Sequence, residues 1–375
     1  MANTKLRCVF FLLAVSFMLS DRFVGGRRIG VMESKELFKH KGTVKTIKGK
    51  DGHIIDCVNI YQQPAFDHPL LKNHTIQMEP TSIPNVTNGE FYDAELFQGW
   101  LKNGECPQRT IPIRRAREDE NYAPRTIRPV ARLNSDYNRN HEYATVDIPS
   151  GHYYGGHASI NVWNPKTYNK DVSIAQIWIS AGPVNELNTI EAGWQVTWLD
   201  KEPKFFIYWT RDGYQQTGCY NLNCPGFVQA ATRMPLYIAQ KILQLNYVLY
   251  DMGNWWLKMH DQVIGYWPRS FFTDLAVGAT QVSFGGEIYS VGQEGHHTST
   301  QMGSGHFPSE GFGKASYFRN LQYMDGSGKF NDAKKGLTKI ETKPSCYYVQ
   351  IADNKNGAYG THFYYGGPGY SPICP

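Results

Sequence analysis

The stretch that decides the fold spans residues 189–196 and reads TIEAGWQV. Alternate side chains of a β-strand share one face. A strand here would place Glu191, Gly193 and Gln195 on one face. It would turn the apolar side chains between them, Ala192 and Trp194, toward the core. Because the glycine leaves open space beside the carboxylate, the pattern predicts a strand whose polar face forms the floor of a cleft.

A second stretch, residues 282–289, reads VSFGGEIY and has the same phase. Here Gly285, Glu287 and Tyr289 would share one face, while Phe284 and Ile288 share the other. Paired glycines before a strand glutamate allow a neighbouring backbone or a ligand to approach closely. Each stretch therefore presents one glutamate from a glycine-containing strand.

From residue 143 onward the chain is a succession of short runs rich in β-branched and aromatic residues, separated by turn residues. The runs are 143–148, 158–163, 173–179, 193–198, 204–209, 255–257, 263–267, 281–284 and 346–351. Many short strands at this spacing predict an all-β domain, either an antiparallel sandwich or a barrel. The segment 234–252 fits either a helix or two strands.

The first 22 residues have the features of a secretory signal peptide. Lys5 and Arg7 precede an apolar run at residues 8–19, which is short for a membrane span. Further on, residues 44–60 alternate around Asp51-Gly52 and predict a β-hairpin. Residues 107–139 are rich in Arg and Pro and keep no period, which indicates an exposed linker or activation segment. We therefore expect a secreted protein with a domain boundary in this linker.

The cysteine count supports secretion. Of 7 cysteines, Cys8 lies in the predicted signal peptide, and an even number in the remainder indicates disulfides. The pairs suggested by proximity along the chain are Cys57–Cys106, Cys219–Cys224 and Cys346–Cys374. A zinc site is the weaker interpretation, because Cys219 and Cys224 lack a second pair at zinc-finger spacing. Sequons at Asn73 and Asn85 predict N-glycosylation.

Composition and motifs argue against several classes of partner. Basic residues gather near the N-terminus and in residues 109–139, which is typical of a tail or linker rather than a nucleic-acid-binding face. The pair His296-His297 lacks metalloprotease spacing. The run GGPG at 366–369 contains Pro and precedes no Lys-Ser/Thr, so phosphate binding is not predicted. We expect no nucleic-acid or membrane partner, no metal and no cofactor.

Two carboxylates brought together on a sheet can divide the work of hydrolysis. Like charges a few ångströms apart do not both ionise easily, so the pair would share a proton. The ionised member can activate a water, and the protonated member can polarise or protonate a scissile amide. Since most strand glutamates are simply solvated, the residues alone make Glu191 and Glu287 candidates and no more.

Longer motifs match a known family. They are GTVKTI (42–47), DCV (56–58), QPAFDHP (63–69), QIWI (176–179), the run around Glu191, GCY (218–220), CPGFVQ (224–229), GNWW (253–256), GYWP (265–268), GEIY (286–289) and QMGSGHF (301–307). These segments are spread over nearly the whole chain after the signal peptide. Together they resemble the neprosin family of plant secreted peptidases.

The resemblance implies an all-β fold, in which an antiparallel β-sandwich akin to concanavalin-like and fungal glutamic-peptidase folds follows a small propeptide domain. Residues 1–22 would be the signal peptide, 23–132 the activation propeptide and 133–375 the catalytic domain. Glu191 and Glu287 fall on the family's two catalytic glutamates. Strand phase adds Gln195 and Tyr289 as candidate supporting residues.

The resemblance also implies an activity and its control. The protein would be a secreted glutamic endopeptidase of the apoplast or cell wall that cuts a peptide or protein substrate after proline at acidic pH. Its own propeptide would cover the cleft as an inhibitor and be removed at low pH. One departure from the family pattern follows Ala230, where segment 234–252 replaces the usual stretch that contains Gly and Ser.

Two other classes are compatible with these patterns. A glycosidase can also use two carboxylates on a sandwich, but such enzymes usually place both within one strand motif. An inactive paralogue that binds carbohydrate or cell wall would use the abundant Trp and Tyr as sugar platforms. The activation-like first domain disfavours this module, because a lectin has no need of a latent form.

Overall fold

The computed structural model describes residues 39–49, 52–82, 99–116, 140–200, 202–236, 247–259, 262–292, 295–352 and 359–375. The predicted signal peptide, the sequon at Asn85, the predicted boundary at residues 132–133 and much of the predicted linker lie outside these ranges. The segment Lys35–Pro375 forms one compact unit. Among the helices that are described, none has the length and apolar character needed to cross a membrane.

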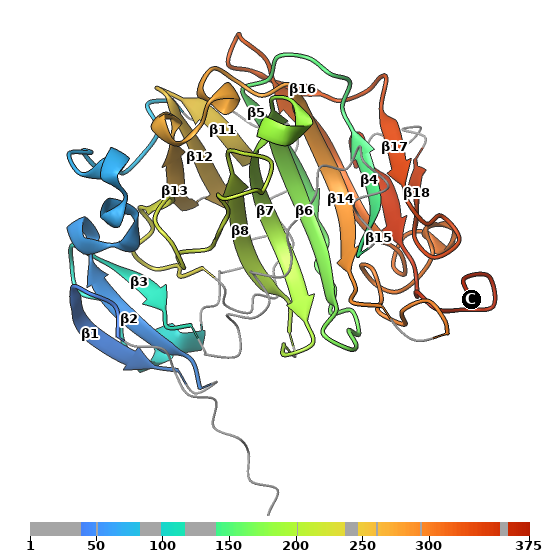
Figure 1. The fold of residues 1–375 in the computed structure, drawn as a ribbon, viewed down its shortest axis with the longest axis horizontal. Coiled ribbons are helices and arrows are strands. Elements are labelled where there is room, and N and C mark those ends of the chain that lie inside the picture. Colours follow the sequence, from blue (N-terminus) through green and yellow to red (C-terminus); the bar gives the residue numbers. More distant parts are fainter. Residues whose placement is uncertain are drawn as a thin grey trace, which may run out of the picture. The chain divides into compact units, whose positions relative to one another are not determined.

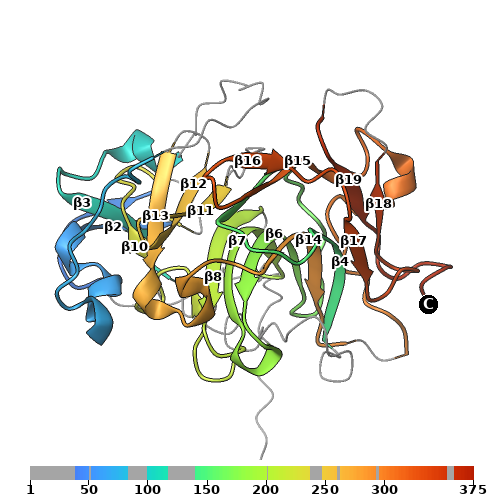
Figure 2. The same ribbon diagram turned by 90° about the horizontal axis from the view of Figure 1, so that it is seen from above.

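Two antiparallel sheets make up the larger domain (Figures 1 and 2). The seven-stranded sheet has the order β17 (Thr338–Glu341), β4 (His141–Asp147), β14 (Gln281–Tyr289), β6 (Val172–Ala181), β7 (Asn188–Thr197), β8 (Lys204–Thr210), β9 (Cys219–Tyr220). The nine-stranded sheet has the order β10 (Val228–Gln229), β13 (Gln262–Pro268), β12 (Asn254–Met259), β11 (Tyr247–Asp251), β5 (Gly155–Ile160), β15 (Ser316–Met324), β19 (Phe363–Gly366), β18 (Tyr348–Ile351), with β16 (Phe330–Asp332) paired to β15. These sheets confirm the predicted sandwich. The ambiguous segment 234–252 contributes strand β11, and its residues 237–246 lie outside the described ranges.

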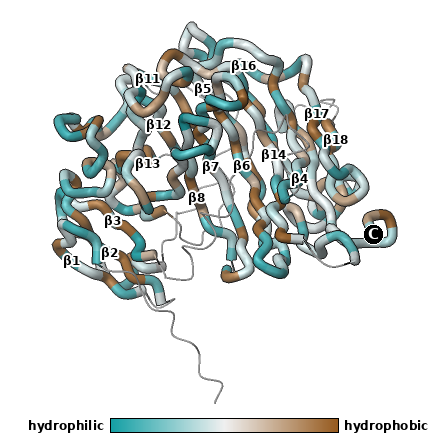
Figure 3. The backbone as a smooth tube through the Cα atoms, viewed as in Figure 1, coloured by the Kyte–Doolittle hydropathy of each residue, from teal (hydrophilic) through white to brown (hydrophobic). Residues whose placement is uncertain are grey.

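The core lies between the two sheets. One cluster of buried side chains contains Ile177 and Ile179 of β6, Phe284 of β14 and Phe318 of β15. Strand β7 is buried along its whole length. Figure 3 shows hydrophobic positions recurring along the strands of the sandwich. Side chains from the inner faces of stacked sheets interdigitate in this way, and the apolar area they remove from water stabilises the sandwich.

A third, small sheet precedes the sandwich, with the order β1 (Thr43–Lys48), β2 (Ile54–Asn59), β3 (Thr110–Arg114). Strands β1 and β2 confirm the predicted hairpin. Strand β3 contradicts the prediction that an exposed linker begins at residue 107, because its side chains are all buried. The alternating Ile111 and Ile113 pack into the core, a short period that the surrounding Arg and Pro concealed.

Short 3-10 helices occupy several connections. They are η1 (Ile60–Gln62), η2 (Pro64–Asp67), η3 (Pro69–Leu71), η4 (Gly99–Asn103), η6 (Val184–Glu186), η7 (Arg269–Phe271), η8 (Asp274–Ala276) and η9 (Pro308–Glu310). The small domain hydrogen-bonds to the nine-stranded sheet. Gln63 Nε2 donates to Gln229 O at 3.2 Å, and Gln63 Oε1 accepts from Gln229 N at 2.8 Å.

All three predicted disulfides are present. They are Cys57–Cys106 in the small domain, and Cys219–Cys224 and Cys346–Cys374 in the sandwich. The first ties β2 to the segment that leads into β3, so it closes the small sheet on itself. The sequon residue Asn73 is exposed, as a glycan acceptor has to be.

Candidate active site

The two candidate glutamates lie on the same face of the seven-stranded sheet, on either side of its central strand β6. Glu191 of β7 pairs with Trp178 of β6, and Glu287 of β14 pairs with Ile174 of β6. Directly paired residues of an antiparallel sheet point to the same face. Two strand spacings across the sheet and the span from Ile174 to Trp178 along β6 put the two Cα atoms roughly 17 Å apart.

Gln176 lies between the two glutamates on this face. Its direct partners on the neighbouring strands are Gly193 and Gly285, which have no side chains. A Cβ atom on Gly193 would collide with the carbonyl oxygen of Ala175, and one on Gly285, whose φ is 150°, would collide with that of Ala144. The glycines therefore let the strands approach closely and leave the centre of the face to Gln176.

Glu191 is buried, with 1% of its surface exposed. Its Oε1 accepts a hydrogen bond from the Tyr214 hydroxyl at 2.7 Å and one from Thr189 Oγ1 at 3.0 Å. Burial and the negative charge of Glu191 raise the pKa of Tyr214 well above its usual range. Tyr214 therefore keeps its hydrogen at neutral and acidic pH and remains a donor to Glu191.

Tyr214 reaches Glu191 from a tight turn after β8. Its φ is 64°, in the left-handed region that side chains other than glycine rarely occupy. Asp212 holds the turn by accepting from the backbone N–H groups of Gln216 and Thr217, each at 2.9 Å. Such a conformation costs on the order of 1–3 kcal/mol and persists only where the surroundings fix it. The placement of the Tyr214 hydroxyl on Glu191 is therefore specified by the local fold.

Glu287 is fully buried and has a different set of donors. His141 Nδ1 lies 2.6 Å from Oε1, and Gln176 Nε2 donates to Oε2 at 3.0 Å. When Glu287 is ionised, the Nδ1 atom carries the hydrogen of this pair, because a carboxylate can only accept. The imidazole ring is stacked on Tyr143 and meets Tyr289 edge-on.

The two carboxyl groups are held by separate sets of donors. Sharing a proton requires two carboxyl groups within a few ångströms. In this sheet each glutamate has its own donor, Gln176 Nε2 on Glu287 and the Tyr214 hydroxyl on Glu191. Different surroundings allow two carboxyl groups to take different protonation states, as a base and an acid require.

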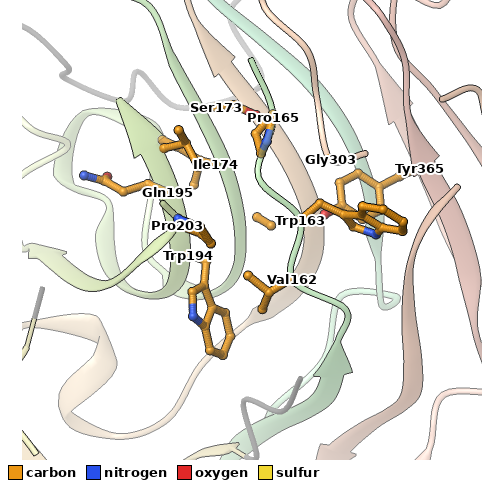
Figure 4. Close-up of a pocket in the computed structure, with 12 residues that line it drawn as sticks. Val162, Trp163, Pro165, Ser173, Ile174, Trp194, Gln195, Pro203, Gly303 and Tyr365 are labelled. Atoms are coloured by element: carbon orange, nitrogen blue, oxygen red, sulfur yellow. The ribbon is translucent and has the colours of Figure 1, made fainter. Parts of the chain in front are cut away.

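The two predicted supporting residues contact other parts of the site. Tyr289 packs against the His141 ring at a centroid distance of 5.1 Å. Gln195 lines a pocket at the end of β6 and β7, shown in Figure 4. Other residues lining it are Val162, Trp163, Ile174, Trp194 and Tyr365. Among the described residues, neither glutamate lines this pocket, so Gln195 marks a space beside the pair.

Sequence reasoning missed the hydrogen-bond partners of the glutamates. Gln176 had a usable signal, since strand phase puts it on one face of β6 and the QIWI motif contains it. Thr189 was likewise in phase with Glu191. His141 precedes the first predicted strand, and Tyr214 lies in a turn, so no local pattern marked either of them.

One cluster in the described residues has the composition of a metal site. A ring nitrogen of His297 and the sulfur atoms of Cys346 and Cys374 lie within 4.8 Å of one another. The two sulfur atoms are joined in a disulfide, and a metal ligand has to be a thiolate. The histidine is then the one possible ligand of the three, and its Nε2 already lies 2.9 Å from the Glu142 carboxylate.

Comparison with known proteins gives two kinds of match. Two crystal structures of scytalido-glutamic peptidase, one with a peptide-based transition state analogue and one with a transition state analogue inhibitor, are 10% identical to this chain. The matches cover 61% and 60% of this chain and 98% of theirs, with TM-scores of 0.36 and 0.35. Similarity of this size supports no residue-level comparison.

The family matches are more informative. The model described as neprosin activation peptide matches residues 46–160. The model described as neprosin matches residues 169–368 of 375, which is more than half of the chain. The chain therefore belongs to the neprosin family and carries that family's activation peptide ahead of the neprosin domain.

Proposed function

We propose that this chain is the precursor of a secreted glutamic endopeptidase, which hydrolyses peptide bonds after proline at acidic pH. The observation that carries the proposal is the placement of Glu191 and Glu287 on one sheet face, both buried and each with its own donors. The activation-peptide match supports a latent precursor inhibited by its own first domain. Export to the apoplast or cell wall and a glycan on the exposed Asn73 belong to the same proposal.

The two glutamates have separate roles in this proposal. Glu287 takes a proton from a water, and the water oxygen forms a bond to the carbonyl carbon of the scissile peptide. Glu191 takes up a proton at acidic pH before the cycle begins and gives it to the amide nitrogen as the carbon–nitrogen bond breaks. The products are a carboxylic acid and an amine, and a proton transfer through solvent restores the starting states. The imidazole donor on Glu287 motivates its assignment as the base, because it can carry a positive charge.

The test uses the secreted protein acidified to about pH 3–4, near the reference pKa of glutamate. A proline-containing peptide is incubated with the wild type and with the Glu191→Gln and Glu287→Gln variants, and the products are mapped by mass spectrometry. We expect cuts after proline from the wild type alone. An intact peptide after demonstrated release of the propeptide would contradict the proposal. That result would favour the inactive, carbohydrate-binding alternative, which a glycan screen would then examine.

A further inference from the structure

We propose that His141 is a positioning residue of this reaction, which orients the Glu287 carboxylate and holds it in the ionised form that activates water. The proposal rests on the proposed peptidase function and extends it to the first strand of the sandwich, β4. No sequence motif links His141 to the site, because His141 and Glu287 are 146 positions apart in the sequence.

The contact is short and dry. His141 Nδ1 lies 2.6 Å from Glu287 Oε1, and the two side chains are 4% and 0% exposed. A buried carboxylate needs a partner, since water no longer solvates its charge. A hydrogen bond in which donor or acceptor is ionised is roughly twice as strong as a neutral one. Among the donors to Glu287 in the described residues, the imidazole alone can become a cation.

The hydrogen bonds fix the carboxylate in orientation as well as in charge. His141 engages Oε1 and Gln176 engages Oε2, so the plane of the carboxylate cannot rotate without breaking a bond. Each oxygen keeps acceptor capacity for a water. An ionised Glu287 held in this way is ready to take a proton from a water placed over Gln176.

The imidazole ring is itself held in place. It stacks on Tyr143 of its own strand at a centroid distance of 6.2 Å and an interplanar angle of 14°. It meets Tyr289 of β14 at 5.1 Å and 60°, and the strand register pairs His141 with Tyr289. Within the described residues, the ionisable groups in contact with the ring are therefore Glu287, Tyr289 and Tyr143.

The chain contains a matched control pair outside the site. Glu142, the next residue on β4, points to the other face, and its carboxylate lies 2.9 Å from His297 Nε2. The side chains of His297 and Glu142 are 7% and 22% exposed. A substitution of His297 thus removes a histidine–glutamate contact of the same kind without touching either candidate catalytic glutamate.

The experiment measures kcat and KM across pH for the wild type and for His141→Phe, His141→Gln and His297→Gln. We expect His141→Phe to lower kcat by about 10²-fold, because misplacing a catalytic group by an ångström has an effect of that order. KM should stay within about twofold, since the ground-state binding surface is kept. The acidic limb of the kcat profile should move to higher pH, because Glu287 loses the partner that favours its ionised form. His141→Gln, which keeps an N–H donor, should recover part of kcat but not the position of the limb, and His297→Gln should match the wild type.

Two results would overturn the proposal. A folded His141→Phe protein with the kcat and pH profile of the wild type would show that the contact has no role in the reaction. If His141→Phe does not fold, an unchanged acidic limb in His141→Gln has the same meaning. A wild type with no peptidase activity would instead refute the proposed function. An active wild type beside an inactive Glu287→Gln variant would support the function, and the His141 variants would then decide the proposal made here.

Discussion

A single atom of the sandwich, the hydroxyl oxygen of Tyr266 on β13, makes two hydrogen bonds to the small domain. His74 Nε2 lies 2.7 Å from this hydroxyl, and Gln77 N donates to it at 3.1 Å. The side chain is fully buried, and burial raises the pKa of Tyr266 to about 12, so the hydroxyl stays protonated. The variant Tyr266→Phe removes the oxygen and keeps the ring.

The magnitude follows from the bonds that are lost. A typical intramolecular hydrogen bond contributes about 0.5–1.5 kcal/mol net, so two of them contribute about 1–3 kcal/mol. The free energy that opposes local opening of residues 69–82 should fall by this amount. The open population should then rise about 5- to 150-fold.

Hydrogen exchange measured by mass spectrometry on the intact chain at neutral pH reads this opening directly. We expect faster exchange in residues 69–82 of Tyr266→Phe and unchanged exchange in β6 and β14. Tyr347→Phe is the control, because the Tyr347 hydroxyl donates to Thr300 O at 2.6 Å within the sandwich. Equal exchange of residues 69–82 in Tyr266→Phe and the wild type would refute the reasoning.

The same contact should respond to acid. Burial lowers the pKa of His74 below its ordinary value of 6.5, so the folded state binds fewer protons than the opened state. The contribution of His74 to closure is therefore complete above pH 6.5 and is lost as the pH falls through the lowered pKa. Opening of residues 69–82 should increase on acidification, and His74→Gln should weaken this pH dependence.

Three further predictions concern stability. Asp56 is fully buried with Arg115 2.6 Å away, so Asp56→Asn should destabilise the small domain by about 3–5 kcal/mol, seen as faster exchange in β2. Burial lowers the pKa of His157 to about 4. The contribution of this histidine to the free energy of unfolding is therefore complete above pH 6.5 and falls by about 3 kcal/mol toward pH 4. His157→Gln should flatten this part of a plot of Tm against pH. Gly193→Ala should lower the free energy of unfolding by at least about 1–3 kcal/mol, because the added Cβ overpacks against Ala175. A Tm of this variant equal to that of the wild type would contradict the close approach of the strands.

The sequence predicted the two glutamate strands because a strand has a period of two. Once 189–196 and 282–289 are strands, the phase alone puts Glu191 and Gln195 on a common face of the first strand. It likewise puts Glu287 and Tyr289 on a common face of the second strand. To place both glutamates on the same face of the same sheet, one needs the register of β6, the strand between them. That register is a non-local fact, and no single stretch contains it.

The remaining errors have similar physical causes. The first strand of the sandwich begins at His141, two residues before the alternation becomes visible, and a ring that contacts a distant strand leaves no local signal. The composition around β3 predicts a linker because Arg and Pro dominate it, while two isoleucines alone mark the buried face of the strand. Composition outweighed a period that was too short to recognise.

The proposed processing of the precursor should leave β4 in place. The activation-peptide model matches residues as far as 160, yet β4 pairs with β14 on one side and with β17 on the other. Removing β4 would strip hydrogen bonds from the strand that carries Glu287 and would also remove His141. We therefore expect the N-terminus of the mature protein, determined by N-terminal sequencing after acid activation, to lie before residue 141. A fully active form that starts beyond residue 147 would show that neither β4 nor His141 is needed.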